Sequence, residues 1–561
     1  MPVAARVRAK GVGMAKQGKR SGTVRIVFLG GVGEIGMNSM AVETGDGIVV
    51  VDCGVMFPSD RCLGPELILP DLRYYRQNAE RIKAVVVTHG HEDHVGAVPL
   101  AFGDTGIPVY APAFAAGLIK ERSLEYTPKP KLDVRVVKAG DTVRAAGIDI
   151  ELVRVTHSIP DALALALRTP AGLVVHTGDF RIDYNPSIGK AFDTDTFARL
   201  GDEGVLLLMS DSTNVERGGR TDSEKWVANN IEELIAGHSG RVLISMFSSN
   251  IERVTLLHRL ARRTGRKLCL VGRSLTMYTR IALECGYTPC DPNALVDPEV
   301  ADTVDPRSLL VLVAGSQGEP RSSLTRLANG EHPDLKIKEG DMVIYSSRMI
   351  PGNEKDILTV SNNLVRLGAT VYHDGNASVH TSGHAQADEL KEMLELVRPT
   401  YFVPVHGEYR FLKAHADLAV KAVGAVPVLA DEGTILSVSP GGVAVAGTMD
   451  VEEYFVEGPL VGNAEALKLK ERRTLLYNGL VVVRCRLRRR GVDVDPDIAL
   501  YGVPDPDGTL VPAILSTLEL AFGDRAVVPT AEEIAEEVRV LVRRVVKKRQ
   551  ARKPLVHTVV C

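Results

Sequence analysis

Short runs of apolar residues, each ended by glycine or a polar residue, recur over the first 210 positions of the chain. Residues 24–30 (VRIVFLG) and 47–54 (GIVVVDCG) are typical. Their length and richness in Val and Ile predict strands that are buried on both faces. Further runs that carry His or Asp at their ends lie at 84–94, 149–157, 172–179 and 205–212. Because polar residues at strand ends gather along one rim of a sheet, we expect this rim to carry the functional site.

Between about 217 and 374 the pattern changes to an alternation of strands and helices. Apolar runs lie at 241–247, 267–272, 308–315 and 341–347, with helical stretches near 250–264 and 274–285. This alternation predicts a parallel-sheet α/β unit inserted into the first domain. Site-type residues resume only at 380–384 (HTSGH) and 404–408 (PVHGE). The first domain is therefore expected to be split in sequence and closed in space.

After about position 450 an acidic, mixed stretch reads as a linker before a C-terminal unit. In that unit Thr530 and Glu533 form the pattern of a capping box that opens a long helix. The predicted organisation comprises a basic N-terminal arm (1–22), a first domain in two parts (23–216 and 375–450), an inserted domain (217–374), a linker (451–474) and a C-terminal domain (475–561).

Composition limits the class of protein and of partner. The chain has 561 residues and a formal net charge of −3, so it lacks the bulk positive field of many nucleic-acid binders, and any basic surface must be local. Seven cysteines without a CxxC pair indicate neither a zinc knuckle nor a disulfide framework. The basic arm lacks the apolar core of a signal peptide, and no apolar run is long enough to cross a membrane. We expect a cytoplasmic protein with no membrane contact, whose arm is solvated or, alternatively, contacts RNA.

The densest cluster of chemically active side chains is Thr-His-Gly-His-Glu-Asp-His at 88–94, expected as a loop after a strand. Imidazole and carboxylate groups suit zinc or manganese. Without a cation, four such groups packed together would repel one another or lose solvation, so a metal centre is favoured over ordinary buried histidines. His89 and His91 can turn to one ion, while Asp93 and His94 face another.

The strand ends supply the ligands that two ions still need. His157, Asp179 and His406 each follow an apolar strand, and a carboxylate such as Asp179 can bridge two ions. The predicted ligands are His89, His91, His157 and Asp179 for one ion, and Asp93, His94, Asp179 and His406 for the other. Each ion then keeps an open position, as catalysis requires.

HxHxDH followed by a single His, Asp and His resembles the metallo-β-lactamase fold, a four-layer αββα sandwich. The long insert, with SDSTN (210–214), SGHA (382–385) and PVHGE, is similar to the β-CASP branch, which processes nucleic acids. The resemblance narrows to the ribonuclease J family. It covers about residues 23–450 and rests on GGVGEIGMN (30–38), DCGVMFP (52–58), HTGDFRID (176–183), FSSNIER (247–253), GSQGEP (315–320), SRMIPGNE (347–354) and HTSGHA (380–385). The implied fold is α/β: a metallo-β-lactamase sandwich split by an inserted β-CASP domain, with a small α+β C-terminal domain.

The resemblance implies roles for individual residues. It implies the seven metal ligands above, with Asp93 also catalytic, and a general acid, His384, oriented by Asp211. His406 is similar to the histidine of RNA-processing members, where DNA-repair relatives tend to carry valine. The implied substrate contacts are Ser248, Ser249, Asn250, His380, Thr381, Ser382, Gly383 and His384. A homodimer or homotetramer formed through the C-terminal domain is also implied.

The expected chemistry follows from the charge of a phosphodiester. Two cations, zinc with manganese as a possible activator, would neutralise it and lower the pKa of bound water. A hydroxide held by both metals would attack and displace the 3′-oxygen, which would take a proton from His384 and leave a 5′-phosphate. The expected activity is 5′-to-3′ exonuclease and endonuclease cleavage of single-stranded RNA, 5′-monophosphorylated for the exonuclease, in RNA maturation and decay.

Several residues have two interpretations. Ser-Ser-Asn (248–250) and Ser-Gly-His (382–384) suit a phosphate pocket but also ordinary turns and helix caps. Asp52 either supports the ligands or simply ends a strand. GVGEIG (31–36) matches a dinucleotide-binding GxGxxG, but no acidic partner follows at the required place, so we reject that interpretation. His176 is interpreted as structural.

Two other functions compete with a ribonuclease: a small-molecule hydrolase on the same metal core, and a non-catalytic RNA-binding scaffold. The insert argues against the first because it makes a cleft long enough for a polymer, and the complete ligand set argues against the second. RNA binding would need a local basic cleft, and each candidate could instead be a solvated surface charge. The candidates are Arg217, Arg220, Arg253, Arg321, Arg326 and Arg348.

Overall fold

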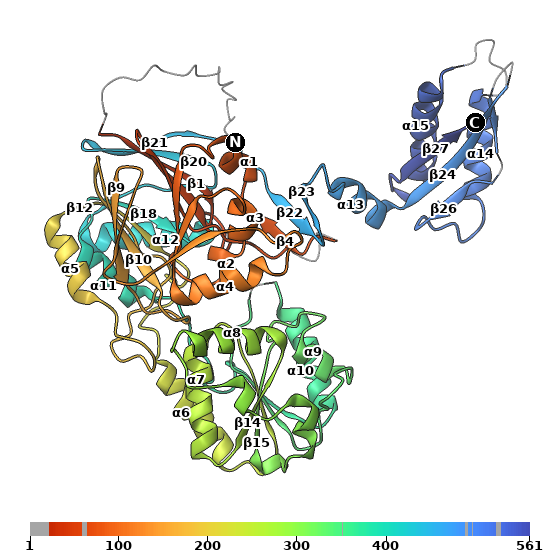
Figure 1. Ribbon diagram of the computed structural model, residues 1–561. Helices are drawn as coiled ribbons and strands as arrows, with labels where there is room; N and C mark the ends of the chain where they lie inside the picture. The colour runs from red at the N-terminus through yellow and green to blue at the C-terminus, as the bar shows by residue number, and fades with distance from the viewer. Residues whose placement is uncertain (1–21, 59–63, 351, 489–491, 496, 523–528) are drawn as a thin grey trace. The chain divides into compact units, whose positions relative to one another are not determined.

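The computed structural model describes residues 22–58, 64–350, 352–488, 492–495, 497–522 and 529–561 (Figure 1). Two compact units divide the chain. The first holds the residues up to Met56 together with Leu69–Val451, and the second holds Phe57–Ile68 together with Glu452–Cys561. The predicted N-terminal arm, 1–22, lies outside the described residues except for its last position.

The first unit contains two mainly apolar sheets. The eight-stranded sheet has the order β21-β20-β1-β2-β3-β5-β6-β7, and the seven-stranded sheet has the order β19-β18-β12-β11-β10-β9-β8. The strands of the first are β1 (Val24–Gly30), β2 (Ser39–Thr44), β3 (Gly47–Val51), β5 (Ile82–Val86), β6 (Pro108–Pro112), β7 (Asp133–Val137), β20 (Thr434–Ser439) and β21 (Gly442–Thr448). Those of the second are β8 (Thr142–Ala145), β9 (Ile148–Arg154), β10 (Leu163–Thr169), β11 (Gly172–His176), β12 (Val205–Asp211), β18 (Tyr401–Val405) and β19 (Val426–Pro427).

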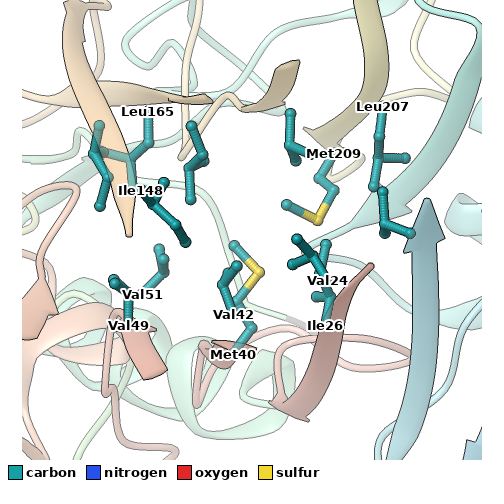
Figure 2. Packing of buried hydrophobic residues seen from close by; sticks show 14 of the residues in the cluster. Val24, Ile26, Met40, Val42, Val49, Val51, Ile148, Leu165, Leu207 and Met209 are labelled. Carbon is teal, nitrogen blue, oxygen red and sulfur yellow. The ribbon is translucent and has the colours of Figure 1, made fainter. Parts of the chain in front are cut away.

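The two sheets pack face to face through one apolar core, and helices cover their outer faces. Val24 and Val42 of the first sheet belong to the same buried cluster as Leu165 and Met209 of the second (Figure 2). A further apolar cluster joins the other face of the seven-stranded sheet to helices α5 (Thr194–Glu203), α11 (Ala387–Val397) and α12 (Tyr409–Val423). Helix α4 (Ala113–Ser123) contacts β6, β7 and α3 (Val98–Phe102), and α1 (Leu72–Gln77) precedes β5 in sequence. The expected four-layer αββα sandwich is confirmed.

The insertion leaves the sandwich after β12 and returns before α11, which leads into β18, and β12 and β18 are parallel neighbours. Between them lies a parallel five-stranded sheet in the order β14-β15-β13-β16-β17, with helices on both faces, as the alternating pattern predicts. Its strands are β13 (Val242–Ser245), β14 (Lys267–Val271), β15 (Leu309–Val313), β16 (Met342–Tyr345) and β17 (Thr370–Tyr372). Its helices are α6 (Glu224–Ala236), α7 (Ile251–Arg263), α8 (Arg273–Glu284), α9 (Ser323–Ala328) and α10 (Glu354–Arg366).

The second unit has more regular structure than its sequence predicts. The stretch expected as a linker, 451–474, forms a hairpin and opens a helix, so that prediction is wrong. In the hairpin, β22 (Tyr454–Glu457) pairs with β23 (Leu460–Asn463) on one side and with β4 (Leu67–Leu69) on the other, and α13 (Leu469–Asn478) follows. The hairpin forms because Tyr454, Phe455 and Val456 are buried.

The C-terminal part of this unit is a small α+β fold. Strand β24 (Leu480–Leu487) pairs with β25 (Val492–Val494), β26 (Ala499–Tyr501) and β27 (Leu555–Val560), and α14 (Leu510–Phe522) and α15 (Ala531–Gln550) share its apolar core. The predicted capping box is confirmed, since Glu533 N donates to Thr530 Oγ1 and Thr530 N donates to Glu533 Oε2. Among the described residues, no helix combines the length and apolarity that a membrane span requires.

Candidate metal centre

The densest part of the site forms where β5 ends and the chain turns across the rim of the sheets. Glu92–Val95 forms one helical turn, α2, with His91 at its N-cap position, so the segment is not a loop throughout. This turn directs Asp93 and His94 toward the ends of neighbouring strands. His406 follows β18 directly and has a φ of 54°, a left-handed conformation that residues other than glycine rarely adopt.

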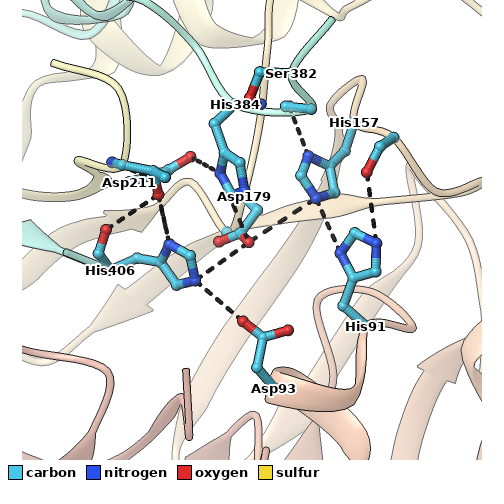
Figure 3. A network of polar contacts seen from close by, with 12 residues as sticks. His91, Asp93, His157, Asp179, Asp211, Ser382, His384 and His406 are labelled. Carbon is cyan, nitrogen blue, oxygen red and sulfur yellow. Dashed lines mark hydrogen bonds and ion pairs between the residues drawn. The ribbon is translucent and has the colours of Figure 1, made fainter. Parts of the chain in front are cut away.

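The structure brings the seven predicted ligands together in two groups that share Asp179. Figure 3 shows His91 and His157 on one side of Asp179, and Asp93 and His406 on the other. In each group the possible ligand atoms lie within 4.8 Å of one another. The groups are His89, His91, His157 and Asp179, and Asp93, His94, Asp179 and His406. The sequence prediction divides the ligands in the same way.

Asp179 occupies the centre of the site and is only 3% exposed. Its Oδ2 lies 3.3 Å from His94 Nε2 and 3.5 Å from His406 Nε2. The same oxygen lies 3.8 Å from His89 Nε2 and 3.9 Å from His157 Nε2. One carboxylate oxygen is thus within reach of histidines from both groups, which is the geometry that a bridging ligand needs.

The electrostatics of the site fit a pair of divalent cations. Burial lowers the pKa values of His89 and His157 well below their ordinary value, so these imidazoles are neutral, as metal ligands must be. Burial is the largest single influence on His94 and His406 and acts against their charge, but Asp179 and the other carboxylates nearby together outweigh it. They raise the pKa of His94 to about 10 and that of His406 well above its usual range. The carboxylates therefore attract positive charge into a buried site, and divalent cations would supply it by displacing those protons.

A third cluster adjoins the ligands and contains Asp179, Asp211, His384 and His406. His384 Nδ1 lies 2.8 Å from Asp211 Oδ2, and Asp211 Oδ1 accepts hydrogen bonds from Thr213 Oγ1 (2.6 Å) and Thr213 N (3.0 Å). Burial opposes a charge on His384, but Asp211 outweighs burial and raises its pKa. Because Asp211 engages Nδ1, Nε2 is the nitrogen that could give a proton to a bound substrate.

Two residues beside the ligands orient them. Asp52 Oδ2 lies 2.8 Å from His94 Nδ1, and the carboxylate accepts hydrogen bonds from Thr88 N (2.7 Å) and Thr88 Oγ1 (2.8 Å). Of the two interpretations of Asp52, the geometry therefore favours support of a ligand. Asn38 is a residue that sequence reasoning missed: its Nδ2 lies 3.0 Å from His94 Nε2 and donates to Asp93 O at 3.1 Å.

The glycine-rich segment 30–38 packs against the ligands instead of opening a helix. His406 N donates to Gly31 O at 2.8 Å, and Asn38 N donates to Asp93 O at 2.8 Å. These contacts agree with our rejection of the dinucleotide-binding interpretation, because the backbone groups of this loop are used within the site. His176 is buried at the end of β11 and lies outside all three clusters.

Side chains of the 380–384 loop are engaged mainly within the protein. Gly383 O accepts a hydrogen bond from His157 Nδ1 at 2.7 Å, which connects this loop to one of the predicted ligands. Ser382 Oγ accepts from His384 N at 3.1 Å, and Thr381 Oγ1 donates to Asp222 O at 2.8 Å. The loop is thus a rigid support that presents His384 to the site.

The Ser-Ser-Asn segment combines exposed hydroxyls with a helix cap. Ser248 and Ser249 are partly exposed, and Ser248 Oγ lies 2.9 Å from Ser274 Oγ. Asn250 is buried and caps α7 by accepting from Arg253 N, the capping role that its sequence also allowed.

A buried ion cluster fixes the 380–384 loop, and Arg253 is at its centre. Arg253 is 1% exposed and donates two hydrogen bonds of 2.9 Å to Glu224, which is also 1% exposed. It further donates to Thr381 O at 3.3 Å and to Ser346 O, and its Nη1 lies 3.1 Å from His380 Nδ1. The interpretation of Arg253 as an arginine that contacts RNA is therefore wrong.

The remaining candidate arginines differ in availability. Arg220 pairs with Glu392 at 2.6 Å, and Arg348 donates to Asn214 Oδ1 at 2.9 Å. Arg326 is half-buried, while Arg217 and Arg321 are exposed. Arg217 and Arg321 are therefore the candidates most available to a basic RNA-binding surface on the inserted domain.

Comparison with known proteins agrees with this geometry. Three family models match the chain: the metallo-beta-lactamase superfamily (residues 32–209), the beta-CASP domain of ribonuclease J (239–364) and the Zn-dependent metallo-hydrolase RNA specificity domain (374–430). A ribonuclease J from Mycobacterium tuberculosis is 37% identical over 544 residues, which cover 96% of this chain and 97% of the relative.

Other relatives extend the same similarity. A ribonuclease J from Sinorhizobium meliloti is 36% identical over 95% of this chain and 96% of its own length, and one from Synechocystis sp. is 37% identical over 86% and 76%. A solved structure of a protein of unknown function from Enterococcus faecalis covers 74% of this chain and 100% of its own, with a TM-score of 0.56 and 17% identity, and shows the fold alone.

Proposed function

This chain belongs to the ribonuclease J family and is a metal-dependent ribonuclease; from that premise we propose that it degrades single-stranded RNA from the 5′ end and also cleaves internally, in RNA maturation and decay. The observation that carries this proposal is the position of the His384–Asp211 pair, whose imidazole Nδ1 lies 3.9 Å from the central Asp179. A proton donor beside a shared metal ligand suits hydrolysis of a phosphodiester.

The seven clustered residues, Asp93 among them, would hold two divalent cations, zinc with manganese as a possible activator, which when bound neutralise the phosphodiester and make water more acidic. In the proposed reaction His384 donates its Nε2 proton to the departing 3′-oxygen. Asp211 keeps the imidazole protonated and correctly turned, since it binds Nδ1. A water molecule supplies the oxygen that joins phosphorus as the P–O3′ bond breaks, so the upstream product ends in a 3′-hydroxyl and the downstream product keeps a 5′-phosphate.

Substrate phosphates are proposed to contact the partly exposed hydroxyls of Ser248 and Ser249, and Ser382 Oγ, which accepts hydrogen bonds from His384 N and Asn214 Nδ2, would donate its proton to a phosphate oxygen. The other predicted contact residues would shape these loops, because their polar groups are already engaged within the protein. They are Asn250, His380, Thr381 and Gly383. A 5′-monophosphate end, a homodimer or homotetramer formed through 475–561, a cytoplasmic location and the boundaries predicted for the first domain and the inserted domain belong to the same proposal.

Digestion of single-stranded RNA labelled at its 5′ end tests the proposed activities. We expect rapid release of labelled mononucleotide from a 5′-monophosphate RNA, and internal cuts in a 5′-triphosphate RNA. His91→Ala removes a ligand and should abolish both products, so any product that persists in this variant comes from a contaminant. Absence of cleavage by the wild-type protein with zinc and with manganese would refute the proposal.

A leaving-group experiment tests the role of His384. We expect His384→Ala to slow cleavage of ordinary RNA by about 10²-fold, the usual contribution of a positioned acid. An RNA with a 3′-bridging sulfur at the cleaved linkage needs no proton on its leaving group, so the same variant should cleave it at close to the wild-type rate. His415→Ala is the control, since His415 is a buried histidine outside the clusters. Equal losses on both substrates would assign His384 a role other than proton donation.

A further inference from the structure

A second pocket lies on the inserted domain, at the opposite end of its sheet from the metal centre. It has a volume of about 430 Å³ and is lined by the C-terminal half of α7, the start of β14 and residues 294–296. Ser248 and Ser249 follow the carboxyl end of β13, whereas Lys267 begins β14. Since β13, β15 and β14 are parallel neighbours, the pocket and the metal centre are separated by at least a strand length, roughly 13 Å.

The polar groups that line this pocket are all basic or imidazole groups. They come from His258, Arg262, Arg266 and Lys267, and the rest of the lining is apolar. Arg262 and Lys267 are exposed at its mouth, while Arg266 is 8% exposed. A site of this size with apolar walls and converging cations has the dimensions of a small-molecule pocket.

Arg266 carries a buried charge that no carboxylate of the described residues contacts. Its guanidinium donates only to carbonyl oxygens: His238 O at 2.8 Å, Gly240 O at 3.0 Å, Leu309 O at 3.2 Å and Pro306 O at 3.5 Å. Burial lowers its pKa, with no opposing acidic group. Such a charge makes the pocket floor positive.

The same excess of positive charge acts on the side chain of His258. Its Nδ1 is buried without a hydrogen-bond partner in the described structure. Burial lowers its pKa, and Arg262 and Arg259 lower it further, with no carboxylate acting against them. Nδ1 itself is shielded from the pocket, so an anion there would act on His258 through its charge and would supply the negative charge that this group of cations lacks.

Complementing the C-terminus of α7 is the simpler role for these cations, because basic side chains are favoured there. Two of the last carbonyls are already occupied, however. Leu260 O accepts from Thr264 N at 3.0 Å, and Ala261 O accepts from Arg266 N at 2.8 Å. The Arg262 side chain is therefore not needed to satisfy them.

We propose that this pocket binds a phosphate-bearing nucleotide unit, either a free nucleoside monophosphate or a unit of an RNA chain that passes over the inserted domain. Arg262 and Lys267 would contact the phosphate, and Leu268, Leu295 and Val296 would contact the apolar face of the base. The pocket is separate from the metal centre, so binding of a nucleotide there does not depend on the cleavage mechanism.

Calorimetric titration of the full-length, metal-loaded protein with AMP tests this site. The pocket variant is Arg262→Glu with Lys267→Glu. The matched control is Lys336→Glu with Arg366→Glu, which reverses two exposed charges of the same domain outside the pocket. We expect one AMP site of the wild type to be weakened about tenfold or more in the pocket variant and unchanged in the control, and to weaken as salt is raised. Arg262→Ala with Lys267→Ala repeats the test if charge reversal disturbs folding.

Steady-state cleavage of a single-stranded RNA identifies the source of the phosphate. If the pocket variant loses the AMP site, the natural ligand is a free nucleotide. If the pocket variant binds AMP as the wild type does but has a higher KM for RNA and the same kcat, the natural ligand is a unit of an RNA chain. Unchanged AMP binding together with an unchanged KM would overturn the proposal. If the wild type cleaves no RNA, the proposed function fails, while the AMP titration still decides whether the pocket binds a nucleotide.

Discussion

Replacement of Asp179 by asparagine is expected to lower RNA cleavage by about 10³-fold or more and to deplete the bound metal, since this carboxylate is the ligand that both ions would share. Asparagine keeps the shape of the side chain but removes the negative charge that sits 3.3 Å from His94 Nε2 and 3.5 Å from His406 Nε2. Without that charge the site loses its main attraction for two cations. Metal content measured by mass spectrometry, beside the rate of RNA digestion, checks both effects.

Asp202→Asn is the matched control for this substitution. Its carboxylate is 80% exposed and pairs with Arg398 on the surface, so the same chemical change should leave both metal content and cleavage intact. A variant at Asp179 that keeps two ions and a normal rate would contradict the shared-ligand geometry. An Asp179 variant that keeps two ions but cleaves slowly would show that Asp179 affects the reactivity of the ions and is not needed to bind them.

The clustering of the seven predicted ligands could be anticipated because their positions follow from local sequence. Most of them follow the end of an apolar strand, with Asp93 and His94 on the helical turn after β5, and parallel neighbours place their ends at the same rim. Asp179 and His406 are 227 positions apart, yet β11, β12 and β18 are consecutive neighbours in one sheet, so both side chains reach the same point. Strand periodicity and residue type together were sufficient.

The supporting contacts could not be predicted, because they depend on pairs that only the folded chain creates. The partner of Arg253, Glu224, lies 29 positions earlier, and the Thr381 carbonyl lies 128 positions later. A sequence shows the same letter for this buried arginine and for the exposed Arg259 on the same helix. Only packing distinguishes an arginine that holds a loop from one that faces solvent.

Errors in the element prediction have a similar origin. Residues 451–474 are polar enough to read as a linker, but the hairpin within them forms because one short apolar stretch, 454–456, finds a partner in β4, nearly 390 positions earlier. The sequence does not predict strand β10 (163–169), because its alternating Leu and Ala are buried on both faces and show no alternation of apolar and polar positions.

Arg253→Met is expected to destabilise the first unit by about 3–5 kcal/mol, the usual cost of removing one partner from a buried ion pair. Methionine fills similar volume but leaves the carboxylate of Glu224, 1% exposed, without the two hydrogen bonds it now accepts. The single tryptophan, Trp226, lies on α6 two residues from Glu224 and reports the loss as a lower urea midpoint in its fluorescence. Arg259→Met, on the exposed face of the same helix, is the control and should shift stability by less than about 0.5 kcal/mol.

A second substitution separates the charge of Arg253 from its hold on the 380–384 loop. Glu224→Gln added to Arg253→Met removes a carboxylate that would keep only Asn250 Nδ2 at 2.9 Å and the Arg181 guanidinium at 3.7 Å as partners, so we expect part of the lost stability to return. Cleavage should stay impaired, because Thr381 O and Ser346 O still lack the donor that fixes the loop carrying His384. The expected deficit is in kcat at pH values where His384 is protonated, with little change in KM, since a misplaced acid slows the chemical step without weakening phosphate contacts. Recovery of stability and of kcat together would show that Arg253 only neutralises Glu224; recovery of stability alone identifies it as the residue that positions the acid.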